Sequence, residues 1–250
     1  MSFSLLKLAV SIVALVISAK VGDVLRRRAS QSKEDSRDDF GVVLAGTLTL
    51  LGLLIGFSFS MAISRYDLRK ANELTEANAI AVEYARADLL AAGDAARVHE
   101  LLKEYLDQRV LFYTMRDERS IPRIETDTLQ LQKELWSTIR SAVASVPPQR
   151  EGLLLTGMSD VFIAQRSTEA AWWNRIPLAA WAMIGATSIG CSFLIGYRAR
   201  RTDWLVFSVM PVSVTIAVFL IADLDSPRGD PIRVIPQNLI SLSHDLRPNQ

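Results

Sequence analysis

The chain has 250 residues, half of them hydrophobic, and its formal net charge is only +1. Such a small net charge gives no electrostatic reason to expect nucleic acid as a partner. The single cysteine, Cys191, excludes an intrachain disulfide and is best interpreted as a small buried apolar side chain. The hydrophobic residues gather in long runs with almost no charge, a pattern typical of membrane-spanning helices. We therefore predict an all-α integral membrane protein with about four transmembrane helices.

Residues 5–25 form the first apolar segment, with Lys7 and Lys20 near its ends. A short apolar run near the N-terminus can also be a cleavable signal peptide. However, no small-x-small cleavage site follows cleanly, and the arginine triplet at 26–28 resists translocation. Lysine side chains near helix ends can reach the polar membrane surface. We therefore favour an uncleaved transmembrane helix over a signal peptide.

The clearest span covers residues 40–63, which contain no charged residue. Gly52 and Gly56 lie four residues apart in it, an arrangement that lets another helix approach closely. We predict that this glycine pair is a helix-packing site.

Aromatic residues in the same span indicate an apolar constriction. Helical rotation of about 100° per residue places Ile55 and Phe59 on one stripe and Phe57 on another side. If this span lines a pore, Ile55, Phe57 and Phe59 could form an apolar constriction that stops ion flow when water leaves it.

Two later segments, residues 177–197 and 204–222, are also apolar enough to span a bilayer. Pro177 suits the first turn of a helix, where its missing N–H is not needed. Trp204 is expected at the membrane interface, and Pro211 is expected to kink the last span.

Basic residues in the two short connections between spans predict the orientation. Short basic loops stay in the cytoplasm because their translocation is disfavoured. Both termini and the long segment 64–176 would then lie on the outer, periplasmic face of a bacterial inner membrane. The residues on which this depends are Lys20, Arg26, Arg27, Arg28, Lys33 and Arg37 in the first connection and Arg198, Arg200 and Arg201 in the second.

Residues 64–176 have apolar positions at helical spacing and are rich in good helix formers. No turn signal separates them from the preceding span, so that helix should continue to about residue 92. Gly93 would then stop it, and Asp94 would cap the next helix, which should end near Ser120, before Pro122. With a further break at Pro147, the segment predicts an extramembrane antiparallel bundle of four helices.

The first helix of this bundle carries a series of charged residues of both signs, which we expect to form a solvated face. The alternative is a vestibule that concentrates ions. At the other end of the bundle, Trp172 and Trp173 are expected in the aromatic belt of the membrane. The charged series consists of Arg65, Asp67, Arg69, Glu73, Glu76, Glu83, Arg86 and Asp88.

No catalytic motif is present. His99 and His244 lie far apart without metal-ligand spacing, and there is no P-loop or nucleophile-elbow sequence. We therefore predict that the protein is not an enzyme and uses no cofactor. Asp223 and Asp225 form the one dense acidic pair and could ligate a divalent cation, although a polar helix end is the simpler interpretation. Arg228 could instead pair with these carboxylates.

Several segments together resemble the bacterial bestrophin-like family of unknown function. They are residues 52–62 (GLLIGFSFSMA), Arg65-Tyr66 with Arg69, residues 76–80 and 86–90, Tyr105 with Arg109, Leu135-Trp136, and the D-L-D-S-P-R-G tail at 223–229 followed by I-R-V at 232–234. The resemblance implies a relation to pentameric anion channels whose second helix lines an apolar neck. In those channels much of the protein is cytoplasmic, the opposite of the orientation that the charges predict.

The sequence thus divides into two spans with a basic cytoplasmic loop (1–63), the four-helix domain (64–176), two more spans (177–222) and a polar C-terminal tail (223–250). The first functional hypothesis is an oligomeric bestrophin-like ion channel or pore component in which the second span lines the pore. The alternative is a membrane-anchored sensor or scaffold whose helical domain binds a partner or ligand. Expected partners are the lipid bilayer, further copies of the chain and inorganic ions, but not nucleic acid.

Overall fold

The computed structural model is all-helical, as predicted, and contains no strand among the residues that it describes, which are 2–29, 36–198, 204–228 and 232–247. The chain divides into two compact units. We call Met1–Ser64 with Arg175–Ile232 the membrane unit, and Arg65–Asn174 with Arg233–Gln250 the bundle unit. Lys33, Arg200, Arg201 and Gly229, on which the sequence analysis drew, lie outside the described residues, as do the side chains of Lys7, Arg37 and Trp204.

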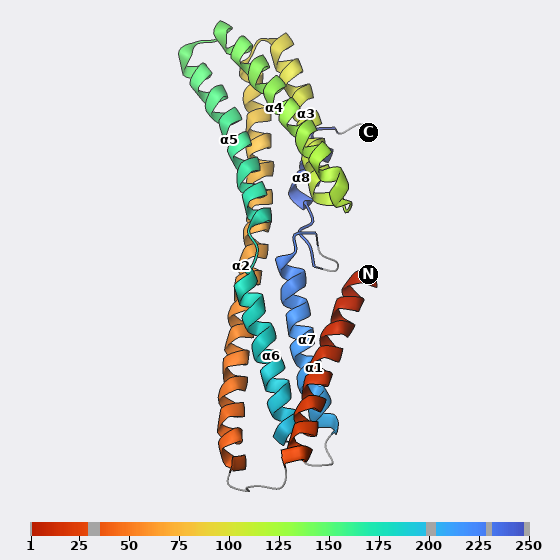
Figure 1. Ribbon diagram of the computed structural model, residues 1–250. Coiled ribbons are helices and arrows are strands. Elements are labelled where there is room, and N and C mark those ends of the chain that lie inside the picture. The colour runs from red at the N-terminus through yellow and green to blue at the C-terminus, as the bar shows by residue number, and fades with distance from the viewer. Residues whose placement is uncertain (1, 30–35, 199–203, 229–231, 248–250) are drawn as a thin grey trace. The chain divides into compact units, whose positions relative to one another are not determined.

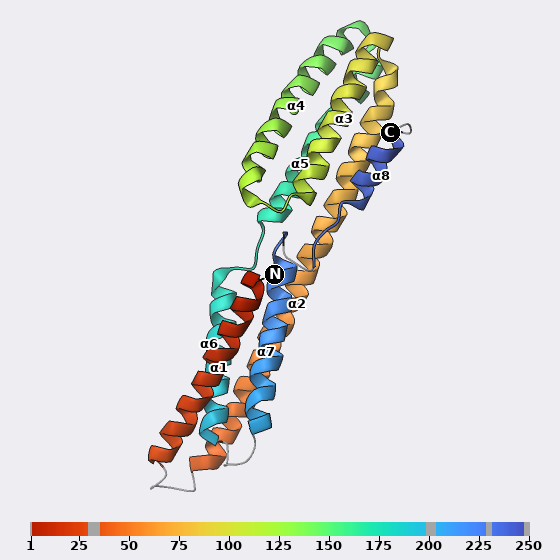
Figure 2. The same cartoon turned by 90° about the vertical axis from the view of Figure 1, so that its right-hand side faces the viewer.

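The membrane unit contains three helices and the first part of a fourth (Figures 1 and 2). The three are α1 (Ser2–Ala29), α6 (Leu178–Arg198) and α7 (Trp204–Asp225), which are joined by the beginning of α2 (Ser36–Arg86). Within the described residues, four helical stretches are long and apolar enough to cross a membrane, which matches the predicted number of spans. Pro211 lies inside α7, and the kink that we expect there stays a prediction.

Two glycines bring α1 and α6 into close contact. A Cβ atom on Gly196 would lie 1.8 Å from the carbonyl oxygen of Ala19, and one on Gly22 would lie 2.2 Å from that of Phe193. Neither distance is possible for a real side chain, so glycine at both positions allows the helices to pack backbone against backbone. Beside this contact, a small apolar core buries Cys191 completely, as the sequence predicted.

The bundle unit contains the second part of α2, α3 (Ala92–Thr114), α4 (Ile121–Ala142), α5 (Pro148–Trp173) and α8 (Gln237–Asp245). Short 3₁₀ turns at Ala87–Leu89, Glu118–Ser120 and Val143–Ser145 connect the first four of these helices, which lie side by side (Figures 1 and 2). Their apolar faces form one large core that includes Leu102, Tyr105, Leu135 and Met158.

Two predicted boundaries were wrong. The long helix ends at Arg86, and α3 begins at Ala92 with Ala91 at its N-cap, so Gly93 and Asp94 lie inside the first turn of α3. The first turn makes few intrahelical N–H bonds and tolerates both residues. Likewise α3 ends at Thr114, well before Ser120, whereas Pro122 lies in the first turn of α4.

The polar C-terminal tail that the sequence predicted is not simply a tail. Its first residues complete α7, and α8 forms farther along it. Val234 and Leu239 are buried in the core of the bundle unit. Val234 and Leu239 therefore anchor an otherwise polar segment in the bundle.

Candidate functional site

The predicted packing glycines of α2 face open space among the residues that the structure describes. Beyond the adjacent backbone of α2 itself, no described atom lies within 4 Å of a Cβ built on Gly52 or Gly56, and both residues are exposed. This is the opposite of Gly22 and Gly196, which the chain itself covers. The surface around Gly52 and Gly56 is thus open to lipid or to another protein copy.

The aromatic residues beside these glycines differ in exposure. Phe57 is 69% exposed and Phe59 is 40% exposed. Ile55, which the sequence analysis placed on a free stripe with Phe59, is half-buried and packs against the apolar core of the membrane unit. The face of α2 that points away from the unit's core therefore centres on Gly56 and Phe57.

Half of the charged series that the sequence placed on a solvated face is buried instead. Arg69, Glu73, Glu76 and Glu83 are each 1% exposed or less. They recur at helical spacing, so they lie on one side of α2 together, and that side packs on the other helices of the bundle unit. Charge alone did not reveal this, because mixed charges at this spacing also suit an exposed helix.

The opposite face of the same part of α2 exposes apolar side chains. Leu68, Leu74 and Val82 are each close to half exposed. This part of α2 therefore buries charged side chains beside the apolar Ala77 and Ile80 and leaves several aliphatic residues exposed. Exposed apolar residues grouped on one face mark a surface that another molecule covers.

Glu76 and Arg109 form the centre of the buried polar cluster. The Arg109 guanidinium donates through Nε to Glu76, and both side chains are fully buried. The Oε2 atom of Glu76 also accepts from the Thr168 hydroxyl at 3.0 Å and from the Tyr113 hydroxyl at 3.4 Å. The carboxylate thus joins α2 to α3 and α5, and no water is needed to satisfy it.

Burial and the neighbouring carboxylate shift the pKa of Arg109 in opposite directions. Burial disfavours the charged form of Arg109, but the Glu76 carboxylate outweighs it and raises the pKa of Arg109. Burial also raises the pKa of Tyr105 and Tyr113, and Glu76 adds to the effect. Arg109 therefore stays charged and both phenols stay protonated. The guanidinium also lies over the Phe112 ring, 4.5 Å from its centroid.

One turn earlier, Glu73 binds the start of α8. Its carboxylate accepts from the backbone N–H groups of Asn238 and Leu239, each at 2.9 Å, and from the Asn238 side-chain amide at 2.6 Å. A second link, between Arg247 and Asp107 at 2.7 Å, fixes the other end of α8 to α3. This hydrogen bond raises the pKa of Arg247.

The predicted acidic pair is engaged by the backbone of its own unit. Asp225 accepts the N–H of Ile176 at 3.0 and 3.1 Å through its two oxygens, and Asp223 accepts the N–H of Ile232 at 2.7 Å. Both carboxylates are buried and Arg228 is half-buried. Within the described part of the chain, no group of three or more His, Cys, Asp or Glu residues could hold a metal ion. The geometry fits a clamp at the end of α7 that also holds the chain just before α6.

The tryptophan pair that ends α5 separates. Trp172 is buried and contacts the rings of Phe112 and Tyr113, with centroids 4.8 and 5.2 Å away. Trp173 is 76% exposed. Only Trp173 is therefore free to reach a membrane interface, while Trp172 belongs to the bundle core.

Several residues important to this arrangement were not found from the sequence. Thr168 and Asn238 carried no signal, because single polar residues on helices are common and usually exposed. Gly22 could have been noted, since it lies on an apolar helix whose partner carries Gly196.

Comparison with known proteins agrees with this fold. The profile of the bestrophin-like domain family matches residues 10–239. Crystal structures of single-substitution variants of a bacterial bestrophin homologue from Klebsiella pneumoniae share the fold. One has a TM-score of 0.66 at 13% identity, covering 98% of this chain and 96% of that chain. Another has a TM-score of 0.66 at 12% identity, covering 98% and 100%. No curated protein matches the sequence significantly.

Proposed function

Because the chain belongs to the bestrophin-like family, we propose that it is a subunit of an oligomeric ion channel or pore component in which α2 lines the pathway. The observation that carries the proposal is the uncovered face of α2 around Gly56 and Phe57. In an assembly with cyclic symmetry, one such face from each copy would point toward a common axis.

The chemistry of this face suits a gate rather than an ion-binding site. In the membrane-spanning part of α2, the rings of Phe57 and Phe59 are exposed, and Gly52 and Gly56 leave the surface beside them without side chains. A narrow ring of phenyl groups expels water, and an ion cannot cross it without its hydration shell. Movement of the rings by a few ångströms would wet the neck and open it. We assign no ion, because an apolar neck does not select one by charge.

The exposed apolar residues of the bundle unit support assembly. Leaving Leu68, Leu74 and Val82 in water has a free-energy cost, at about 25 cal/mol for each Å² of apolar surface. Contact with α2 of a neighbouring copy would remove that surface from water. The buried charges on the other side would then hold the bundle rigid while copies associate.

We further propose the orientation that the short basic connections indicate. Both termini and the 64–176 domain would lie on the periplasmic side of a bacterial inner membrane. Among the basic residues of these connections, the structure describes Lys20, Arg26, Arg27 and Arg28 on α1 and Arg198 at the end of α6.

Conductance of the purified full-length protein in a planar bilayer tests the channel. Phe57→Ala should raise unitary conductance, because it widens the apolar neck. Ile17→Ala on α1 is the matched control, since it also removes an exposed apolar side chain from a span, and it should leave conductance unchanged. No current from any of the three folded proteins would refute the channel.

A second candidate is a membrane-anchored sensor or scaffold. The exposed face of Leu68, Leu74 and Val82 favours it, because the same surface could receive a partner protein instead of another copy. Cysteine cross-linking at position 74 distinguishes the two in membranes. Cross-linking between copies supports the channel, and its absence together with absent current supports the scaffold.

A further inference from the structure

Spans α1 and α6 run parallel and end side by side. The Ser18 hydroxyl donates to the carbonyl of Ile189 at 2.9 Å, and Gly22 lies against the backbone of Phe193 and Tyr197. The contacts advance in the same direction along both helices, so their C-terminal ends meet at one end of the membrane unit.

The beginning of α2 joins the same end. The Phe40 ring lies 4.9 Å from the Tyr197 ring. The Arg198 guanidinium rests against the backbone of α2, because a Cβ on Gly41 would lie 2.7 Å from its Nη1 atom. Three helix ends therefore converge here, and they gather cations that are separated in the sequence.

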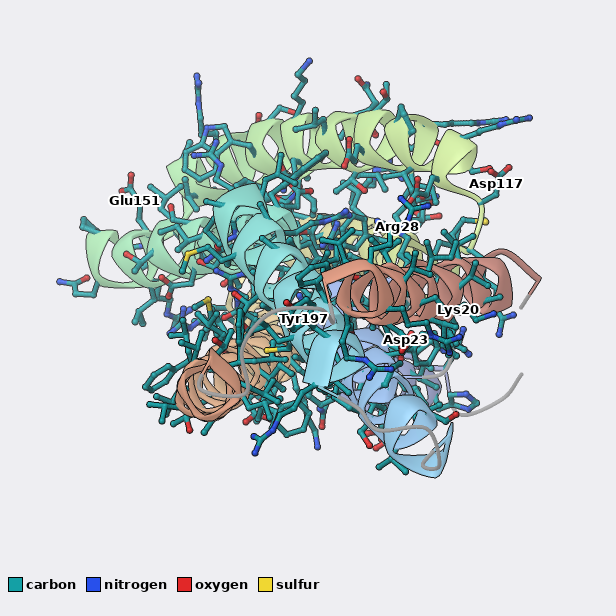
Figure 3. All side chains as sticks on the ribbon, turned by 60° about the horizontal axis from the view of Figure 1, so that its bottom comes forward. Lys20, Asp23, Arg28, Asp117, Glu151 and Tyr197 are labelled. Carbon is teal, nitrogen blue, oxygen red and sulfur yellow. The ribbon has the colours of Figure 1, made fainter. Side chains whose placement is uncertain are left out.

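Among the side chains that the structure describes, this end carries more positive than negative charge. Asp23 pairs with Arg26 at 2.7 Å and with Arg27 at 2.8 Å, so one carboxylate faces two guanidiniums. Lys20, Arg28 and Arg198 are exposed and make no ion pair with any residue that the structure describes. Figure 3 shows Lys20, Asp23 and Arg28 along the last turns of α1, with Tyr197 of α6 among the labelled residues.

An apolar surface lies directly beside these cations. Val21, Val24 and Leu25 on α1 are each close to half exposed, and they precede Arg28 by one to two helical turns. A ligand that fits this arrangement has a negative headgroup and an aliphatic tail. Lys20, roughly 12 Å from Arg28 along the helix, can extend its side chain toward the same level.

We infer that this end of the membrane unit binds the headgroup phosphate of an anionic phospholipid, with Lys20, Arg28 and Arg198 as its cations. The acyl chains lie along the exposed aliphatic face of α1, and Tyr197 sits at headgroup depth as interfacial tyrosines do. This site is separate from the proposed pore face on α2, and it does not depend on whether the protein conducts ions.

Thermal unfolding of the purified full-length protein in a neutral detergent tests the inference. A short-chain phosphatidylglycerol should raise the melting temperature, whereas phosphatidylcholine with the same acyl chains should not. Each cation near an anionic headgroup is worth about 1 kcal/mol, so each substitution should weaken the apparent affinity roughly fivefold. The triple variant Lys20→Gln/Arg28→Gln/Arg198→Gln should therefore lose nearly all of the phosphatidylglycerol effect.

A matched triple variant controls for the change in net charge. Lys133→Gln/Arg140→Gln/Arg150→Gln removes one lysine and two arginines from exposed positions of the bundle unit and should keep the full lipid effect. Circular dichroism verifies that both triple variants are folded. The inference is overturned if the first triple variant retains the phosphatidylglycerol effect, or if the control loses it equally. It is also overturned if inorganic phosphate at the same concentration stabilises the protein as much as the lipid.

Discussion

The Glu73 carboxylate on α2 caps α8 through Asn238, a residue that lies 165 positions away in the sequence. Oε1 accepts the backbone N–H of Asn238 and Oε2 accepts its side-chain amide, at 2.9 and 2.6 Å. A helix N-terminus normally receives its cap from a residue next to it in the chain. Here Pro236 occupies the N-cap position and supplies no side-chain bond, so another helix provides the acceptor.

Removing this cap should release α8. Glu73→Ala leaves the N–H groups of Asn238 and Leu239 without their acceptor, which should cost about 2 kcal/mol of unfolding free energy. Hydrogen exchange of residues 237–245 should accelerate, while exchange in α4 stays unchanged. Glu104→Ala on the exposed side of α3 is the control and should alter neither. Unchanged protection of α8 in Glu73→Ala would show that its apolar contacts alone hold it.

The Glu76–Arg109 pair should behave as a coupled unit. Glu76→Gln or Arg109→Met leaves the remaining charge buried without its partner, which should cost about 3–5 kcal/mol. The double variant Glu76→Gln/Arg109→Met buries no charge and should recover most of that loss. Chemical unfolding of the four proteins gives the coupling energy. Additive losses would mean that the two side chains do not depend on each other.

Substitution of Glu83 should not lower the unfolding free energy, in contrast to substitution of Glu76. Its side chain is fully buried, neither oxygen has a hydrogen-bond partner within the described residues, and the nearest cation, Arg86, is 3.9 Å away. Burial raises the pKa of Glu83 to about 8, so this side chain is mostly a neutral acid at pH 7. Glu83→Gln replaces it with a neutral amide of similar size, so the unfolding free energy should stay the same or rise. A loss on Glu83→Gln as large as that of Glu76→Gln would contradict this contrast.

The two kinds of glycine should differ under substitution. Gly196→Leu should prevent folding, since its Cβ would collide with the backbone of Ala19. A Cβ on Gly56 meets no described atom beyond the adjacent backbone of α2, so Gly56→Leu should fold normally, with an unchanged melting temperature after dissociation. In detergent sizing, it should lower the fraction of oligomer, because the bulky side chain keeps a neighbouring helix away. An unchanged oligomer would place Gly56 against lipid.

Reporter fusions test the orientation. Fusions placed after Arg28 and after Arg201 should report the cytoplasm, and a fusion at Pro148 should report the periplasm. A cytoplasmic signal at Pro148 would reverse the proposed orientation. The basic ends of α1 and α6 would then face the periplasm.

The sequence by itself determined the helical membrane class, the number of spans and the continuation of the second span into the bundle. These follow from local properties. Apolar runs as long as these are stable as helices within a bilayer. A helix that leaves the bilayer continues until a helix-breaking residue ends it. The family resemblance was also readable, because it rests on short segments in a fixed order along residues 52–234.

Only the tertiary structure decided which face of α2 is buried. Arg69, Glu73, Glu76 and Glu83 looked like a solvated face because their spacing fits one. Their burial depends on partners on α3, α5 and α8, among them Arg109, Thr168 and Asn238. The same holds for Gly22 and Gly196, whose closeness exists only once α1 and α6 pack. Whether a charged residue or a glycine is buried depends on the helices that pack against it, because its free energy depends on the groups that replace water around it.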